Sequence, residues 1–137
     1  MSDKLLKKYT GRTAEGVVTA DVAAEAEAID DLGAFGWLRG MRDRALMLEL
    51  RRKDGNVMAF GYYTLEKVGF NPSEGITLHF GGQQVKLLGR NLGGETRPGV
   101  RLLQGVLRHR VPWIREADEP MLMQVGKAAL VVEAIKW

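Results

Sequence analysis

Arginine is the residue type in this sequence with the clearest chemical use. Eight arginines fall in two short stretches, "GWLRGMRDRALMLELRRK" at 36–53 and "LRHRVPWIRE" at 107–116, and each stretch contains a tryptophan. A guanidinium group makes planar, paired hydrogen bonds to phosphates and carboxylates and also packs on aromatic rings. The pattern is therefore typical of a surface that binds anionic groups, on which we expect Arg42, Arg44, Arg90, Arg101, Arg108, His109 and Trp113.

The same arginines also have a structural interpretation. Arg110 lies seven residues after Leu103, so a helix that continued this far would place Arg110 near its apolar side, where it would need a carboxylate partner. Asp43 lies between Arg42 and Arg44 and could supply that carboxylate, which would make "RDR" an ion-pair hub between helix and sheet. Both interpretations, structural ion pairs and a binding surface, stay open at this point.

Cofactor and metal chemistry have little support in the sequence. The Gly-rich segment "FGGQQVKLLGRNLGGETRPG" at 80–99 has the element order of a phosphate loop, but it contains neither the Gly-Lys pair nor G-x-G-x-x-G. We therefore expect an ordinary strand-to-helix connection and no cofactor. The chain has no cysteine, and its two histidines, His79 and His109, fall short of the ligand set of a metal site. We expect no bound metal.

Catalytic residues are equally hard to find. The serines are Ser2 in the N-terminal segment and Ser73 in a turn, neither of them in a G-x-S-x-G elbow, and no spacing forces two carboxylates together. We therefore expect no catalytic residue. An enzyme would need a pocket that the sequence does not reveal, and His109, Glu49 and Tyr63 would be the first residues to examine in it.

Composition places the chain among ordinary globular domains. Its 137 residues are 45% hydrophobic and 27% charged, as expected for a single folded domain. The absence of cysteine excludes a disulfide framework and fits a cytoplasmic location, which we expect. No apolar run is long enough for a secretory signal or a membrane span, so we expect no membrane partner. The net charge of +3 is mild for a protein dedicated to nucleic acid.

The N-terminal part of the chain differs from the rest. Residues 13–31, "TAEGVVTADVAAEAEAIDD", are small, acidic and rich in alanine, and they offer few large apolar side chains for docking. We expect residues 1–31 to form a tail or a weak peripheral helix that begins near Asp21, and residues 32–137 to form one globular β-rich domain.

Alternating apolar residues predict a meander of two hairpins. The first has its turn at 53–56, where Asp-Gly favours a tight reversal, and the second turns at Gly81-Gly82. A further turn is expected at 71–75, "NPSEG". The residues expected to face inward are Leu46, Leu48, Leu50, Met58, Phe60, Tyr62, Ile76, Leu78, Phe80, Val85 and Leu87.

Beyond residue 99 the pattern changes. "VRLLQGVLRHR" at 100–110 has the apolar spacing of an amphipathic helix, bounded by Pro98 and Pro112. "PMLMQV" at 120–125 and "AALVVEAI" at 128–135 are expected to be two closing strands, although the second segment would fit a short helix equally well. Together the elements predict an α+β fold, mainly antiparallel β, in which a small, strongly bent sheet or a partly open barrel carries one packed amphipathic helix.

The hypothesis that follows is a non-enzymatic binding or assembly module that acts through a sheet surface and the arginine-rich helix. Its partner would be another protein or a second copy of the chain. The alternative is a small barrel that binds single-stranded nucleic acid, and an enzyme is a third possibility. A nucleic-acid module needs one contiguous positive face joining Arg42, Arg90, Arg101 and Arg108, whereas an assembly module needs an exposed strand edge or apolar patch.

Overall fold

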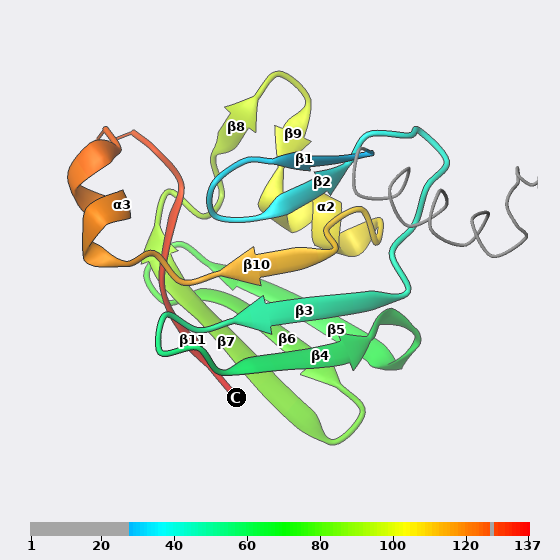
Figure 1. Cartoon of the computed structure of the whole chain (residues 1–137). Coiled ribbons are helices and arrows are strands. Elements are labelled where there is room, and N and C mark those ends of the chain that lie inside the picture. The colour runs from blue at the N-terminus through cyan, green and yellow to red at the C-terminus, as the bar shows by residue number, and fades with distance from the viewer. Residues whose placement is uncertain (1–27, 127) are drawn as a thin grey trace, which may run out of the picture. The chain divides into compact units, whose positions relative to one another are not determined.

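The computed structural model describes residues 28–126 and 128–137 (Figure 1). The chain divides after Asp30, and Asp31–Trp137 forms one compact unit. The tail predicted over residues 1–31 lies almost entirely outside the described residues and stays a prediction.

In the described residues, most of the regular structure is antiparallel β-sheet with two short α-helices, which confirms the predicted α+β, mainly β class. The strands are β1 (Ile29–Asp31), β2 (Gly36–Leu38), β3 (Met47–Arg51), β4 (Val57–Gly61), β5 (Leu65–Asn71), β6 (Gly75–Phe80), β7 (Gln83–Arg90), β8 (Glu95–Arg97), β9 (Val100–Arg101), β10 (Trp113–Arg115) and β11 (Val131–Lys136). The helices are the 3₁₀ turn η1 (Tyr62–Thr64), α2 (Leu102–Leu107) and α3 (Glu119–Gln124).

Two larger sheets organise the compact unit. One has four antiparallel strands in the order β11-β7-β6-β5, and the other has the order β10-β3-β4, in which β10 runs parallel to β3. The short pair β8-β9 precedes α2. Within the described chain no ring of hydrogen-bonded strands closes into a barrel, and β4 and β5 each end a sheet as edge strands.

Both predicted hairpins are present. β3 and β4 pair from Met47 opposite Gly61 to Arg51 opposite Val57, and β6 pairs with β7 across the Gly81-Gly82 turn. At the β3–β4 turn the Asp54 carboxylate accepts the Asn56 N–H at 2.9 Å, and the intervening glycine has a φ of 95°. Glycine adopts this left-handed region with little cost, so local chemistry is sufficient for the reversal.

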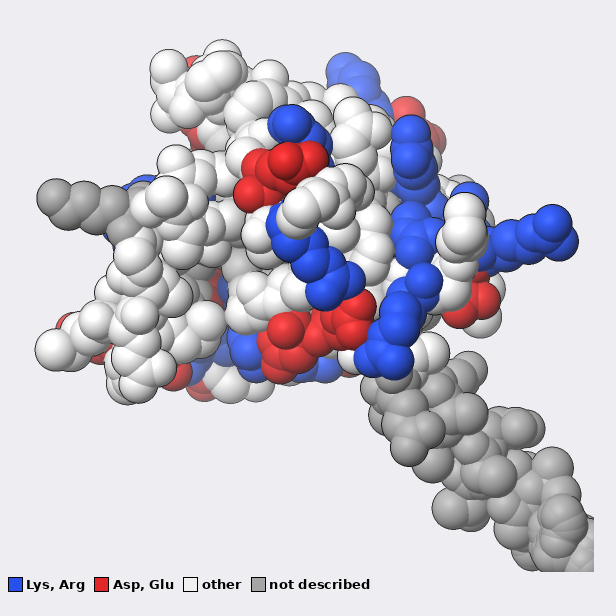
Figure 2. Space-filling view, turned by 90° about the horizontal axis from the view of Figure 1, so that it is seen from above, with Lys and Arg blue, Asp and Glu red and all other residues white. Residues whose placement is uncertain are grey.

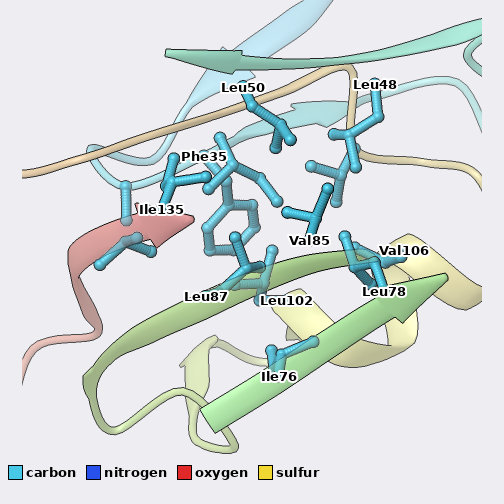
Figure 3. Close-up of a cluster of buried hydrophobic side chains, with 14 of the residues drawn as sticks. Phe35, Leu48, Leu50, Ile76, Leu78, Val85, Leu87, Leu102, Val106 and Ile135 are labelled. Carbon is cyan, nitrogen blue, oxygen red and sulfur yellow. The ribbon is translucent and has the colours of Figure 1, made fainter. Parts of the chain in front are cut away.

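The core lies between the two larger sheets and α2 (Figure 3). Leu48 and Leu50 of β3 point toward Val85 and Leu87 of β7. Most of the residues expected to face inward are buried there, but Leu46 is 85% exposed and Met58 40%. Leu46 precedes the first paired residue of β3, and Met58 lies on an edge strand, so alternation alone overstated their burial.

The helices differ from the prediction. Instead of one amphipathic helix over 100–110, α2 has six residues and β9 precedes it, and a second six-residue helix, α3, replaces the predicted strand over 120–125. The expectation of a strand there was wrong because helix-start chemistry decides the segment. The Asp118 carboxylate accepts the Met121 N–H at 3.0 Å, and Pro120 occupies the first turn. The last segment forms a strand and not the alternative short helix, but β11 spans Val131–Lys136 and so begins three residues later than predicted.

Six of the strands in the described residues had no counterpart in the prediction: β1, β2, β5, β8, β9 and β10. β5 is an edge strand that carries Glu66 and Lys67, so its apolar alternation is weak. β10 was unexpected because its partner β3 is parallel to it and far away in the sequence. A parallel pair leaves no turn signal between its strands.

Candidate functional site

The turn that ends α2 positions two arginines. The N–H of His109 donates to the carbonyl of Val106 at 3.1 Å, and the N–H of Arg110 donates to that of Gly105 at 2.8 Å. These two bonds form a Schellman motif, in which the His109 position usually holds glycine. His109 has a φ of 57°. The turn fixes where Arg108, before it, and Arg110, after it, leave the helix.

A buried tyrosine supports this turn. The ring of His109 stacks on that of Tyr62, with centroids 4.5 Å apart and planes 21° apart. The Tyr62 hydroxyl donates to the carbonyl of Val111 at 2.6 Å, and burial raises the pKa of Tyr62 above its ordinary value of 10.0. Stacking with Tyr62 stabilises a backbone conformation that is otherwise unfavourable for histidine.

Main-chain carbonyls hold the guanidinium of Arg110. Its Nη1 donates to the carbonyl of Met41 at 3.0 Å and its Nη2 to the carbonyl of Leu38, while its central carbon lies 5.2 Å from the ring centroid of Trp37. The predicted partner, Asp43, folds back over Gly40, where an added Cβ would lie 2.1 Å from its carboxylate oxygen. Neutral oxygens therefore take the place of the expected ion pair.

Arg44 approaches the same carbonyl group. Its Nη1 donates to Met41 at 3.3 Å and to the carbonyl of Asp43 at 2.9 Å. Two guanidinium groups thus meet at the single oxygen of Met41, and the three acceptors of these four hydrogen bonds are all neutral carbonyls. A carbonyl dipole compensates only part of a full charge, so the positive potential persists and favours an anion beside the pair.

A hollow of about 320 Å³ opens next to these two arginines. We call it the arginine hollow, and its lining residues are Trp37, Met41, Arg44, Gly99, Val100, Gln104, Arg108 and Arg110. Over residues 28–126 and 128–137, which the structure describes, this lining contains three arginines and no acidic residue. Seen from the side of β8 and β9, basic side chains form a row along part of the surface (Figure 2). The hollow can attract and orient an anionic group.

The structure brings some of the predicted site residues together and separates others. Arg44 and Arg108 line the arginine hollow, and Arg42 is exposed on the same turn as Arg44. Arg101 is exposed and donates to the carbonyl of Gly93 at 3.3 Å. Arg90 lies on β7 outside the lining of the hollow.

Arg90 forms an ion pair with Glu133 of β11, at 3.4 Å. His109, also predicted for the surface, stacks on the tyrosine below α2 and is half-buried. The predicted residues are therefore distributed over several places, and the hollow collects only part of them.

The tryptophan rings are covered. Trp113 is only 8% exposed, with the guanidinium carbons of Arg51 and Arg115 at 4.7 and 5.0 Å from its ring centroid. The guanidinium of Arg52 lies 3.6 Å from the ring centroid of Trp137. The third tryptophan, in the arginine hollow, is also 8% exposed. Each tryptophan thus serves packing and cation–π contact with the protein's own arginines.

The residues named for a possible enzyme do not converge on the hollow. Glu49 accepts a hydrogen bond from Arg51, Tyr63 is 89% exposed, and neither these nor His109 line the arginine hollow. Among the residues that the structure describes, no group of three or more His, Asp or Glu side chains could hold a metal ion. In the same part of the chain, no helix has the length and apolar character to span a membrane.

Sequence reasoning missed some of the lining. Gln104 was not among the expected site residues, although its spacing places it one turn before Arg108 on the polar side of α2. Nothing in the sequence predicts that the Met41 carbonyl accepts from both arginines, because every residue carries a carbonyl group.

Comparisons of the chain with protein-family models, with curated proteins and with solved structures find no match. The geometry of the site therefore carries the argument on function. Guanidinium groups stay protonated at all ordinary pH values, so they bind and orient anions but do not exchange protons with them.

Proposed function

We propose that this protein is a non-enzymatic binding module that holds an anionic group of a partner protein in the arginine hollow. The observation that carries this proposal is the meeting of Arg44 and Arg110 at the carbonyl of Met41. An anion beside the two guanidinium groups would offset their repulsion. Hydrogen bonds between charged groups contribute roughly 1.5–3 kcal/mol each.

Burial of the tryptophan rings favours a protein partner over single-stranded nucleic acid, since the exposed Tyr63 lies outside the lining of the arginine hollow. A single strand gains about 1–3 kcal/mol for each base that stacks on an exposed ring. Trp37 and Trp113 are buried, and Arg52 covers Trp137. Arg90, needed for a continuous positive face, pairs with Glu133. A short acidic segment of a protein needs neither an exposed ring nor a continuous positive face. We propose that such a partner is cytoplasmic.

The test is a titration of the full chain into a labelled peptide rich in Glu and, separately, into the matching peptide with Gln at those positions. We expect binding to the Glu peptide only, weaker at about 200 mM salt than at about 50 mM. Arg108→Glu should weaken it at least about tenfold, while Lys136→Glu, an exposed residue of β11 with the same charge change, should not.

Two outcomes would contradict the proposal. If the Glu peptide does not bind at tens of micromolar, the arginine hollow is not a site for acidic segments. If a single-stranded oligonucleotide binds more tightly than the peptide and loses that binding in the Arg108→Glu variant, the partner is nucleic acid instead.

A separate observation supports assembly of the chain with itself. The edge strand β4 has no charged residue, and its Val57 and Met58 are 54% and 40% exposed. The strand β5, at an edge of the four-stranded sheet, carries Glu66 and Lys67, charges that discourage pairing with further strands. We infer that β4 pairs antiparallel with β4 of a second copy, because an uncharged strand matches itself while a charged partner strand would bury an unpaired charge.

Sedimentation over a range of protein concentrations tests this pairing. We expect the wild-type chain to dimerise and Ala59→Lys to stay monomeric, since the new charge would face its own copy at the centre of the pair. Gln84→Lys, an exposed position on the inner strand β7, should dimerise like the wild type. A wild-type chain that stays monomeric at all concentrations would rule the pairing out.

A further inference from the structure

We infer that the group which the arginine hollow takes is a phosphate monoester on a side chain of the partner protein. This inference rests on the proposed function and makes its ligand more specific.

Charge balance is the first argument. Within the described part of the chain, the lining holds Arg44, Arg108 and Arg110 and no acidic residue, and the nearby Asp43 turns back over Gly40. A carboxylate carries a single negative charge, whereas a phosphate monoester carries about −1.5 to −2 near neutral pH. The phosphate therefore matches three guanidinium groups better than one carboxylate does.

The arrangement of donors is the second argument. A planar carboxylate is satisfied by one guanidinium in a paired contact. Here the guanidinium groups come from different segments, with Arg44 on the turn before β3, Arg108 at the end of α2, and Arg110 beyond the Schellman turn. Gln104 adds an exposed amide from α2. Donors that approach from several directions suit a tetrahedral group with three free oxygens.

Unused hydrogen-bonding capacity points the same way. The Nε of Arg110 is buried and has no hydrogen-bond partner among the described residues. Arg44 uses only Nη1 in its contacts with Met41 and Asp43. The exposed guanidinium of Arg44 thus keeps N–H groups available for a ligand after the protein's own carbonyls are satisfied, whereas the Nε of Arg110 is enclosed by the protein.

The size and walls of the hollow suit an ester better than a free ion. Its volume of about 320 Å³ is larger than a single phosphate needs. Trp37 and Val100 provide apolar wall, and the side chain of Met41 is 87% exposed at the same site. This apolar surface can pack against the carbon atoms that carry the phosphate.

The test compares three otherwise uncharged octapeptides that differ at one position, holding phosphoserine, glutamate or serine. With the full chain at about pH 7.5, we expect the phosphoserine peptide to bind at least about tenfold more tightly than the glutamate peptide, and the serine peptide not to bind. At about pH 5.5 the advantage should shrink, because the second pKa of the phosphate is about 6. Arg108→Ala should reduce the advantage, and Lys136→Ala should not.

Equal binding of the phosphoserine and glutamate peptides would overturn the phosphate inference while leaving an acidic partner in place. If the wild-type chain binds neither the phosphoserine peptide nor the Glu-rich peptide, the proposed function is overturned too. Two further results would overturn the phosphate inference by assigning the phosphate to a source other than a protein side chain. In one, inorganic phosphate competes as strongly as the phosphopeptide. In the other, the chain binds more tightly to vesicles that contain a phosphorylated lipid.

Discussion

Arg44 and Arg110 donate hydrogen bonds to one acceptor, the main-chain oxygen of Met41, at 3.3 and 3.0 Å. The two arginines differ in what else holds them. Arg110 also donates to the carbonyl of Leu38 and lies over the ring of Trp37, whereas Arg44 is exposed and bonds only within its own turn. Arg110 therefore belongs both to the fold and to the site.

The contacts of Arg110 with the fold predict that its replacement lowers stability more than replacement of Arg108, an exposed arginine of the same hollow. Arg110→Ala would leave the carbonyls of Leu38 and Met41 without this donor, so we expect the free energy of unfolding to fall by about 2–3 kcal/mol. Arg108→Ala removes an exposed side chain and should change it by less than about 0.5 kcal/mol while weakening peptide binding. Urea unfolding followed by tryptophan fluorescence measures both. Equal losses of stability would show that Arg108 is structural.

The positive φ of His109 predicts that a glycine variant is more stable than an alanine variant at this position. His109→Ala loses the stacking on Tyr62 and keeps the unfavourable backbone conformation, so we expect a loss of about 1 kcal/mol. His109→Gly loses the same stacking but adopts the left-handed conformation at little cost, and should lie within about 0.5 kcal/mol of the wild type. Thermal unfolding of the three proteins gives the order. A glycine variant no more stable than the alanine variant would contradict it.

The Tyr62 hydroxyl predicts a stability change with a distinctive pH dependence. Tyr62→Phe leaves the carbonyl of Val111 without this buried donor, and below pH 10 we expect a loss of about 1–2 kcal/mol. Burial raises the pKa of Tyr62 in the folded state above its ordinary value of 10.0. Above that pH the unfolded chain loses the proton first, so wild-type stability falls as pH rises.

The phenylalanine variant lacks this ionisation. The difference in unfolding free energy between the two proteins should therefore shrink above about pH 10. Urea unfolding at a series of pH values from about 8 to 11 tests this prediction. A difference that stays constant across the series would mean that the hydroxyl ionises equally in both states.

Gly105 predicts that a helix-favouring substitution destabilises the protein. In an exposed helix Gly→Ala gains about 1 kcal/mol. At Gly105 the new Cβ would lie 2.5 Å from Cζ3 of Trp37 and 2.7 Å from Cγ2 of Val111, and overpacking of this kind costs about 1–3 kcal/mol. We expect a lower melting temperature and a changed tryptophan spectrum. Gln104→Ala, an exposed neighbour on the same helix, should leave both unchanged.

Glu116 predicts a coupling between the β3–β4 turn and β11. Its carboxylate accepts the N–H of Lys53 at 2.9 Å and that of Ile135 at 2.6 Å. Glu116→Ala leaves two backbone donors without this acceptor, and we expect a loss of about 2–4 kcal/mol in unfolding free energy. Glu66→Gln, an exposed change on β5, should have almost no effect. Hydrogen exchange should show faster exchange at Lys53 and Ile135 specifically.

Some of the fold was predictable because its causes are local. The alternation of Ile76, Leu78 and Phe80 places one face of β6 in the core, and the Asp-Gly pair at 54–55 reverses the chain within a few residues. The apolar content of 120–125 predicts a strand, but the Asp118 cap makes the segment a helix. The local signal that decides this segment is the helix cap, not the run of apolar residues.

Two features depended on residues far apart in the sequence. The parallel pairing of β10 with β3 joins Trp113 to Glu49, and nothing between them signals it. The sequence also placed arginines near tryptophans without showing that Arg51 and Arg115 would cover Trp113.

The sequence by itself determined the hairpins, the β-rich class and the concentration of arginine in two stretches, since each depends on neighbouring residues. Only the tertiary structure decided what those arginines do. A carboxylate partner can be sought in a sequence, whereas a carbonyl acceptor is present at every residue. The fold alone selected Leu38 and Met41 to hold Arg110, and so left the arginine hollow with positive charge that no carboxylate among the described lining residues balances.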